Sequence, residues 1–406
     1  MKLFAQHGAQ AGEKITEGLT QGLLDGAVFS PRDIALDTLR TKLDAMATNF
    51  PTAERLFDPQ YYAVFLADNQ DARLGYLADD YSVYLQQRRR GQLEREAKVR
   101  DDVRAALDFQ KSLAVTSLIA PGILIPRSLN SVETVIAKNF IRAAGEEFAG
   151  LNDARKVFAT LAISREALVD KQELIEFVNE ITALETPPHG FYLLVAARNT
   201  EARSDIYHAD VIAGWMFLNH VLKLNGFEVI NGYSDILTPF LGAAGGTAGC
   251  FGWWSNLRAF SIDRFAPSSG MARLPIQRYL SVGLLNRITY FELDALREIV
   301  PGVLNALPLD RLYPITENGE ARGSEPKRAE EVLQSWEAVK VLNQKLVQTD
   351  SENSLRQCLQ AIGQAKRLYD SIPLPMDSKS NKDHLEPLRE GIDLFARLAE
   401  IEPPTD

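Results

Sequence analysis

The sequence predicts an α/β fold, a (β/α)8 TIM barrel with a C-terminal helical appendage. Short apolar runs alternate with segments of helical spacing over about the first 265 of the 406 residues. Eight such runs in that length are what a (β/α)8 barrel needs. Most of the runs end in polar segments. A doubly wound open sheet stays open as the alternative, because spacing alone does not show that a sheet closes.

Apolar runs predict the first four strands at residues 2–5, 27–29, 55–57 and 113–116. Helical spacing follows the second run, and Asp33 can cap that helix. Between the third and fourth runs lies an excursion at about 63–110, whose later part is dense in charge. This composition indicates a solvated helix, and an insertion is one interpretation of the segment.

Four further runs complete the predicted barrel at residues 157–163, 191–197, 227–230 and 250–254. Helical spacing fills the intervals between them. We therefore predict a barrel over residues 1–265. A loop-rich extension packed on the barrel is expected at 266–323, and a small helical C-terminal region at 324–406.

The stretch 227–260 contains the last two predicted strands and gives the clearest β/α pattern of the barrel. Its two apolar runs flank a glycine-rich turn with Gly245 and Gly246, and Trp253 and Trp254 stand side by side. Loops after the last two strands of such barrels often bind phosphate or another anion, and glycine lets a ligand approach the backbone. We expect these four residues to contact a ligand. In the alternative interpretation, the tryptophans fill the core and the glycines only turn the chain.

Composition limits the partners and the compartment. The formal net charge is −10, so a broad nucleic-acid footprint is disfavoured, although a local basic groove stays open. The only cysteines, Cys250 and Cys358, are too few for a thiolate-rich zinc cluster, and they suggest a reducing compartment. No stretch approaches eighteen uninterrupted apolar residues, so we expect a cytoplasmic protein without a membrane partner.

In a closed barrel, the residues that follow the strands share one rim. Strand ends are expected near Gln6, Asp33, Asp58, Ser117, Ser164, Arg198, Asn231 and Asn256. The rim is rich in arginine and amide groups, which suit a purine-like or anionic small ligand. The expected ligand-binding rim residues are Gln6, Arg32, Asp33, Gln60, Arg198, Asn231, Tyr233, Asn256 and Arg258. For any one of them, a helix cap or a loop hydrogen bond is the alternative.

Asp58 is the candidate catalytic residue. Pro59 fixes the backbone after it, and Gln60 can contact the edge of a ring. A carboxylate near arginines at a barrel mouth is expected to stay ionised, with a lowered pKa, and to act as the acid–base group. No metal-ligand spacing, phosphate-binding loop, dinucleotide fingerprint or nucleophile elbow occurs, so neither metal nor cofactor is expected.

Two segments resemble the tRNA-guanine transglycosylase family, whose members exchange a purine base at a nucleic-acid glycosidic bond. Residues 56–65 resemble the family's strand-end segment with an aspartate, a glutamine and an apolar run. The resemblance implies an acid–base role for Asp58. Residues 232–252 resemble the penultimate helix and the last catalytic strand. The resemblance covers roughly residues 1–265.

The chain departs from that family at two places. Cys250, Phe251 and Gly252 stand where the family's nucleophilic aspartate is expected, and the C-terminal zinc ligands are missing. The resemblance therefore implies a divergent relative, of the kind found in bacterial phage-defence gene clusters.

Whether the protein is an enzyme stays open. One function is transferase- or glycosidase-like exchange on a guanine- or 7-deazaguanine-type base, its nucleoside or a nucleic acid. The others are a non-catalytic module that keeps the pocket, and a structural subunit of a multiprotein defence complex. Such a subunit would bind its partner proteins through the C-terminal helices.

Overall fold

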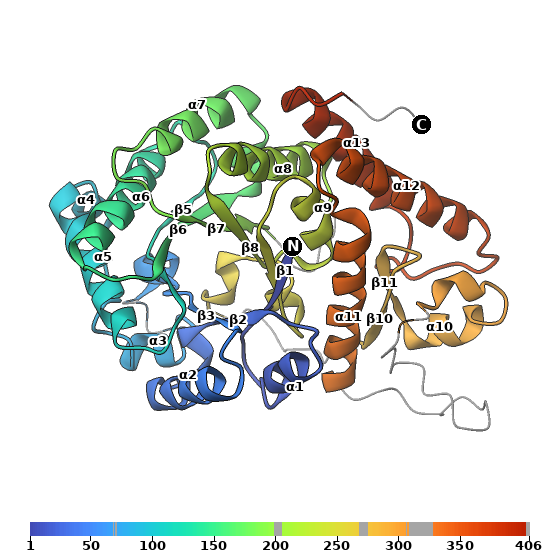
Figure 1. The fold of residues 1–406 in the computed structure, drawn as a ribbon, viewed down its shortest axis with the longest axis horizontal. Coiled ribbons are helices and arrows are strands. Elements are labelled where there is room, and N and C mark those ends of the chain that lie inside the picture. The colour runs from blue at the N-terminus through green and yellow to red at the C-terminus, as the bar shows by residue number, and fades with distance from the viewer. Residues whose placement is uncertain are drawn as a thin grey trace.

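The computed structural model describes residues 1–67, 69, 71–198, 205–267, 275–305, 307 and 328–402. Within them, eight parallel strands form a nearly closed barrel (Figure 1). The strands are β1 (Lys2–Gln6), β2 (Gly26–Phe29), β3 (Glu54–Phe57), β4 (Ser117–Ala120), β6 (Lys156–Ser164), β7 (Gly190–Ala196), β8 (Glu228–Gly232) and β9 (Ala248–Phe251). Their order around the barrel is β3-β2-β1-β9-β8-β7-β6-β4, and the two-residue β5 (Leu124–Ile125) also pairs with β6.

The two ends of this sheet meet between β3 and β4. The backbone N–H of Thr116 donates to the carbonyl of Arg55 at 2.9 Å, and the N–H of Arg55 donates to Oγ1 of Thr116 at 3.0 Å. These contacts bring the edges of the sheet together, so the predicted TIM-barrel fold is confirmed and the open sheet is wrong.

Helices cover the barrel. They are α1 (Lys14–Thr20), α2 (Leu36–Asn49), α5 (Glu96–Lys111), α6 (Val132–Gly150), α7 (Lys171–Thr182), α8 (Ala209–Leu224) and α9 (Thr238–Ala243). In α2 the buried residues Leu39, Leu43 and Met46 recur at helical spacing and face the core. Side-chain caps start two of the helices: Ser131 accepts from the third residue of α6, and Asp170 does the same for α7.

The charged excursion forms the short helices α3 (Tyr76–Asp79) and α4 (Arg90–Leu93) and then α5. Helix α5 buries Val99, Val103, Ala106 and Leu107 and packs against α6 and β4. It is therefore a regular outer helix of the barrel rather than an insertion. Its charged residues are exposed or half-buried except Asp102, which is buried and accepts from the Tyr61 hydroxyl at 2.5 Å.

The predicted loop-rich extension contains regular structure that the sequence did not indicate. Strands β10 (Arg278–Ser281) and β11 (Asn286–Thr289) form an antiparallel hairpin, and the helix α10 (Tyr290–Leu296) follows it. Residues 268–274, 306 and 308–323 of that extension, and 324–327 at the start of the C-terminal region, lie outside the described residues.

The expected helical C-terminal region comprises α11 (Arg328–Leu346), α12 (Ser351–Asp370) and α13 (Leu385–Leu398), which lie together on one side of the barrel (Figure 1). Helix α13 packs along α8, and α11 and α12 pack on α9. The buried Trp336 of α11 donates its indole N–H to the carbonyl of Phe251 at 3.2 Å. No helix in the described ranges is long and apolar enough to cross a membrane.

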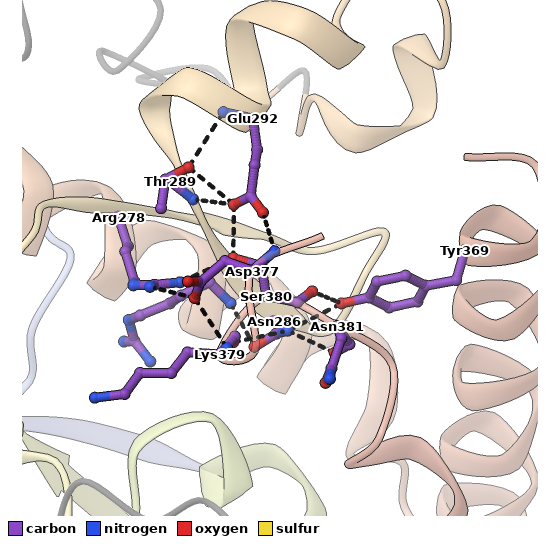
Figure 2. A network of polar contacts seen from close by, with 10 residues as sticks. Arg278, Asn286, Thr289, Glu292, Tyr369, Asp377, Lys379, Ser380 and Asn381 are labelled. Carbon is purple, nitrogen blue, oxygen red and sulfur yellow. Dashed lines mark hydrogen bonds and ion pairs between the residues drawn. The ribbon is translucent and has the colours of Figure 1, made fainter. Parts of the chain in front are cut away.

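A polar network joins the hairpin region to the segment between α12 and α13 (Figure 2). The carboxylate of Glu292 accepts from the N–H of Asp377 at 2.7 Å and from Oγ of the buried Ser380 at 2.6 Å. Arg278 donates to the same two residues, at 2.7 Å to the Asp377 carboxylate and at 2.8 Å to the Ser380 hydroxyl. Two sequence-distant segments are thereby held in one arrangement.

Candidate functional site

Asp58 follows β3 at the carboxyl end of the barrel and is fully buried. Its Oδ1 accepts from the backbone N–H of Gln60 at 2.9 Å. Its Oδ2 accepts from the hydroxyl of Tyr62 at 2.8 Å, and the hydroxyl of Tyr192 lies 3.4 Å away. Donors from η2 (Tyr61–Leu66) and from β7 thus hold the carboxyl group in one orientation.

Burial raises the pKa of Asp58 to about 6, although hydrogen bonds and the positive charge of Arg264 act in the opposite direction. The expected lowered pKa was therefore wrong. The loss of hydration in a fully buried position outweighs the attraction of the nearby arginine. Perturbed groups of this kind concentrate at functional sites, so the structure strengthens the case for Asp58 by a different physical route.

Buried polar side chains from several barrel segments surround Asp58. We call this set the mouth cluster: Gln6, Ser30, Asp58, Tyr62, Tyr192, Tyr233 and Arg264. The amide of Gln6 accepts from the Tyr192 hydroxyl at 3.1 Å and donates to Oγ of Ser30 at 3.5 Å. The cluster lies at the carboxyl end of the barrel, which is the face that carries the active site in TIM-barrel enzymes.

Arg264, in η7 (Ile262–Arg264), is the cation of the mouth cluster, and its side chain is 3% exposed. It donates to the Tyr233 hydroxyl at 2.6 Å and to Oδ2 of Asp33 at 2.9 Å. Arg32 donates to the other oxygen of Asp33 at 2.6 Å. Asp33 does not cap α2, because Asp80 accepts from the first N–H of that helix. Asp33 instead forms ion pairs with these two arginines.

Gln60 occupies the left-handed region of backbone space, with φ at 52°. Its Oε1 accepts from the N–H of Arg32 at 3.0 Å, whereas its Nε2 is buried without a partner among the described residues. Tyr233 is also left-handed, with φ at 55°. Non-glycine residues are strained in this region, and such strain is common at functional sites.

The two tryptophans hold the loop that follows β1. Both indole N–H groups donate to the carbonyl of Ala9, at 2.8 Å from Trp253 and at 3.2 Å from Trp254. Arg258 donates to the carbonyl of Trp253 at 3.1 Å and pairs with Glu331 of α11 at 3.3 Å. Because Trp253 is buried, these contacts favour the core interpretation for it.

Gly245 and Gly246 lie away from the mouth cluster, and so does the side chain of Asn231. The glycines precede β9 and are therefore at the amino end of the strands. The side chain of Asn231 points out to α8, where it accepts from Trp215 Nε1 at 2.7 Å and donates to Asn219 at 2.7 Å. Asn231 lies near the carboxyl end of β8 as expected, but its side chain faces α8 and not the rim. The two glycines lie at the opposite end of the barrel from the mouth cluster, because a turn before a strand lies opposite to a turn after it.

The structure places the other predicted rim residues in different positions relative to the strand ends. Ser117 begins β4 instead of following a strand. Arg198 lies just after β7, is exposed, and pairs with Glu166; the neighbouring Asn199 is outside the described residues. Asn256 lies in η6 (Ser255–Leu257) after β9, and its buried Oδ1 has no partner in the part of the chain that the structure describes.

Sequence reasoning missed Tyr62, Tyr192 and Arg264. Tyr192 is a polar side chain within an apolar strand, and Tyr62 lies four residues after Asp58. Both features of the sequence could have indicated that these tyrosines lie near Asp58. No feature of the sequence indicated Arg264, because it is far from the other members of the mouth cluster along the chain and is brought to them by the fold.

A cleft of about 450 Å³ lies at the opposite, amino end of the barrel, between the start of β1 and α11. Lys2, Asp25, Thr247, Lys340 and Asn343 are among its lining residues. It does not reach the mouth cluster. No group of three or more His, Cys, Asp or Glu side chains that could hold a metal occurs within the described ranges.

No protein-family model matches the chain, and no curated protein matches it. The residues and the geometry of the mouth cluster are therefore the basis for its function.

Proposed function

We propose that the protein binds a guanine- or 7-deazaguanine-type base, free or within a nucleoside or nucleic acid, at the mouth cluster. Asp58 serves there as the acid–base group of a base-exchange reaction. The observation that carries the proposal is a fully buried carboxyl group at the carboxyl end of a TIM barrel, with a pKa raised to about 6.

The chemistry of a purine ring suits this arrangement. A carboxyl group with a pKa near 6 can both accept and donate a proton close to neutral pH, as an acid–base group must. Tyr62 and Tyr192 orient it, and Nε2 of Gln60, which has no partner among the described residues, offers a donor for a ring acceptor. Together these groups supply complementary donors and acceptors for the edge of a base.

A non-catalytic binding module is the second candidate, and Cys250 favours it. Cys250, Phe251 and Gly252 stand near the position where the resemblance would place the nucleophile, and of these three only Cys250 carries a nucleophilic side chain. Burial raises the pKa of its thiol well above the ordinary value, so a reactive thiolate is disfavoured. Base exchange in this protein would then proceed without a nucleophile at that position, whereas binding alone would not require one.

The test combines binding and exchange. The full chain is incubated with guanine and 7-deazaguanine, and with polynucleotide carrying labelled guanine, and bound base and released label are measured. We expect the wild type to bind the base and to exchange it. Exchange should be lost in Asp58→Asn and kept in Asp25→Asn, at the other end of the barrel. Binding without exchange would support the non-catalytic candidate. Absence of binding to all of these probes would contradict both.

A further inference from the structure

A second polar cluster lies beside the mouth cluster, and the proposed base-binding site does not use it. Its centre is Arg287 on β11, which is 8% exposed. Nη1 of Arg287 donates to Oδ2 of Asp235 at 2.5 Å. The guanidinium carbon lies 5.8 Å from the centre of the Phe251 ring at the end of β9. Arg287 thus reaches from the C-terminal hairpin to the segments that follow the last two barrel strands.

One edge of this guanidinium group is unused. Nε and Nη2 of Arg287 are buried and have no hydrogen-bond partner among the described residues. These two N–H groups form the fork that pairs with two oxygens of a carboxylate or a phosphate. Buried donors without a partner are destabilising and rare in folded proteins. An acceptor that pairs with these two N–H groups would therefore stabilise the protein.

The charges around Arg287 also favour an anion. Arg258 and Arg328 both pair with Glu331, while Arg287 pairs with Asp235. Three guanidinium groups thus meet two carboxylates in this described part of the chain. Burial and then the positive charge of Arg287 lower the pKa of Arg258, so the two arginines are close enough to repel each other. A bound anion would relieve that repulsion.

The segment after β8 connects this second cluster to the mouth cluster. Tyr233 and Asp235 are both left-handed, with φ at 55° and 43°. Tyr233 contacts Arg264 in the mouth cluster, whereas Asp235 contacts Arg287. Tyr233 belongs to the mouth cluster, and Asp235, two residues later in the same turn, belongs to the cluster around Arg287. The two clusters are therefore next to each other.

The hairpin holds Arg287 in position before any ligand binds. The side-chain oxygen of Asn286 accepts from the backbone N–H of Arg287 at 2.8 Å. Its own amide donates to the Tyr369 hydroxyl at 2.9 Å and to the carbonyl of Asn381 at 3.1 Å, within the network of Figure 2. A fork that is fixed in advance loses little conformational entropy on binding.

We propose that the Nε–Nη2 edge of Arg287, supported by Arg258, binds a phosphoryl group of the ligand. The site lies beside the loops after the last two strands, a position at which TIM barrels often bind phosphate. The ligand class is then a phosphorylated nucleoside or a nucleic acid, not a free base. This assignment of the ligand rests on the proposed base-binding function, whereas the anion site itself does not.

The test compares inorganic phosphate, guanosine and guanosine 5′-monophosphate by calorimetric titration of the full chain. We expect the monophosphate to bind about 10-fold more tightly than guanosine, because a bidentate arginine contact is added. Arg287→Lys keeps a positive charge opposite Asp235 but removes the fork. It should abolish that preference and the binding of inorganic phosphate, and leave guanosine binding unchanged. Arg389→Lys on the surface of α13 is the matched control and should change neither.

A second variant keeps the proposal testable if Arg287→Lys does not fold. Asp235→Asn removes a competing negative charge, and it should tighten phosphate binding several-fold. Unchanged or weaker phosphate binding in that variant would overturn the anion site. Equal affinity of the wild type for guanosine and its monophosphate would overturn it too, while leaving the base-binding proposal intact. Phosphate binding that depends on Arg287, without any guanosine binding, would support the anion site and contradict the base proposal.

Discussion

The hydroxyl of Tyr192 lies 3.1 Å from Oε1 of Gln6 and joins β7 to β1, two strands that are not neighbours in the sheet. The same hydroxyl lies 3.4 Å from Asp58, which follows β3. One phenol therefore contacts polar groups from two other walls of the barrel. This contact fixes the carboxyl of Asp58 relative to the rest of the mouth cluster.

Tyr192→Phe tests this relationship. The substitution keeps the ring but leaves the buried amide oxygen of Gln6 without its donor, and an unpaired buried acceptor costs ~1–3 kcal/mol. We expect the free energy of unfolding, measured with denaturant, to fall by that amount. The pKa of Asp58 should also rise further, because this hydroxyl lowers it. Tyr76→Phe, at a tyrosine that is 49% exposed, is the control and should be neutral.

The raised pKa of Asp58 predicts a specific pH dependence. The folded carboxyl titrates at about 6 and the unfolded one at its ordinary 3.8, so between these values the folded state binds more protons. The contribution of Asp58 to the free energy of unfolding is then greatest below about pH 4 and falls as the pH rises through 6, by ~3 kcal/mol in total.

The comparison of wild type with Asp58→Asn isolates this effect. Burial lowers the pKa of His7 to about 3, and this residue contributes with the opposite sign in part of the same range. The difference between the two unfolding free energies removes the contribution of His7, since both proteins contain it. A difference that stays constant from pH 4 to pH 7 would refute the raised pKa.

Gly246 is expected to matter for stability and not for ligand binding. A Cβ there would lie 2.8 Å from the side-chain oxygen of Asn219 and 3.0 Å from the carbonyl of Leu241. Gly246→Val should therefore lower the free energy of unfolding by ~1–3 kcal/mol through overpacking. Gly150→Ala, where nothing lies within 4 Å, is the control. Lost ligand binding with an unchanged melting temperature would instead restore the expected contact with a ligand.

The fold was predictable because alternating apolar runs and helices carry most of the information about a barrel. The residues at which each strand begins and ends within its apolar run were harder to predict. The apolar stretch from Leu113 to Ala120 is nearly continuous, so hydrophobicity alone does not show that β4 begins at Ser117. The hairpin β10–β11 was missed because its four-residue strands contain Arg278, Asn286 and Arg287 and do not form apolar runs.

The candidate site was only partly predictable. The position of Asp58 at the carboxyl end of the barrel was predictable, because a carboxylate directly after an apolar strand lies there. Its protonation was mispredicted, since the sequence does not show how completely the position is buried. The partner of Asp33 could not be inferred either, because Arg264 lies 231 residues away along the chain.

Arg264 gives the sharpest test of the mouth cluster. Arg264→Met keeps the apolar stem of the side chain but removes the cation that contacts Asp33 and Tyr233. Breaking a buried ion pair by removing one partner costs ~3–5 kcal/mol, and we expect the low end because Arg32 still pairs with Asp33. The control Arg389→Met, in an exposed pair on α13, should change stability by less than ~0.5 kcal/mol.

The double variant Arg264→Met with Asp33→Asn decides whether the two residues act as a pair. If they do, the double variant should be more stable than the sum of the single effects by ~1–3 kcal/mol, because each change removes the same interaction. Denaturant unfolding of the four proteins at one pH measures this coupling. Strict additivity would show that Arg264 and Asp33 do not stabilise the fold as a pair.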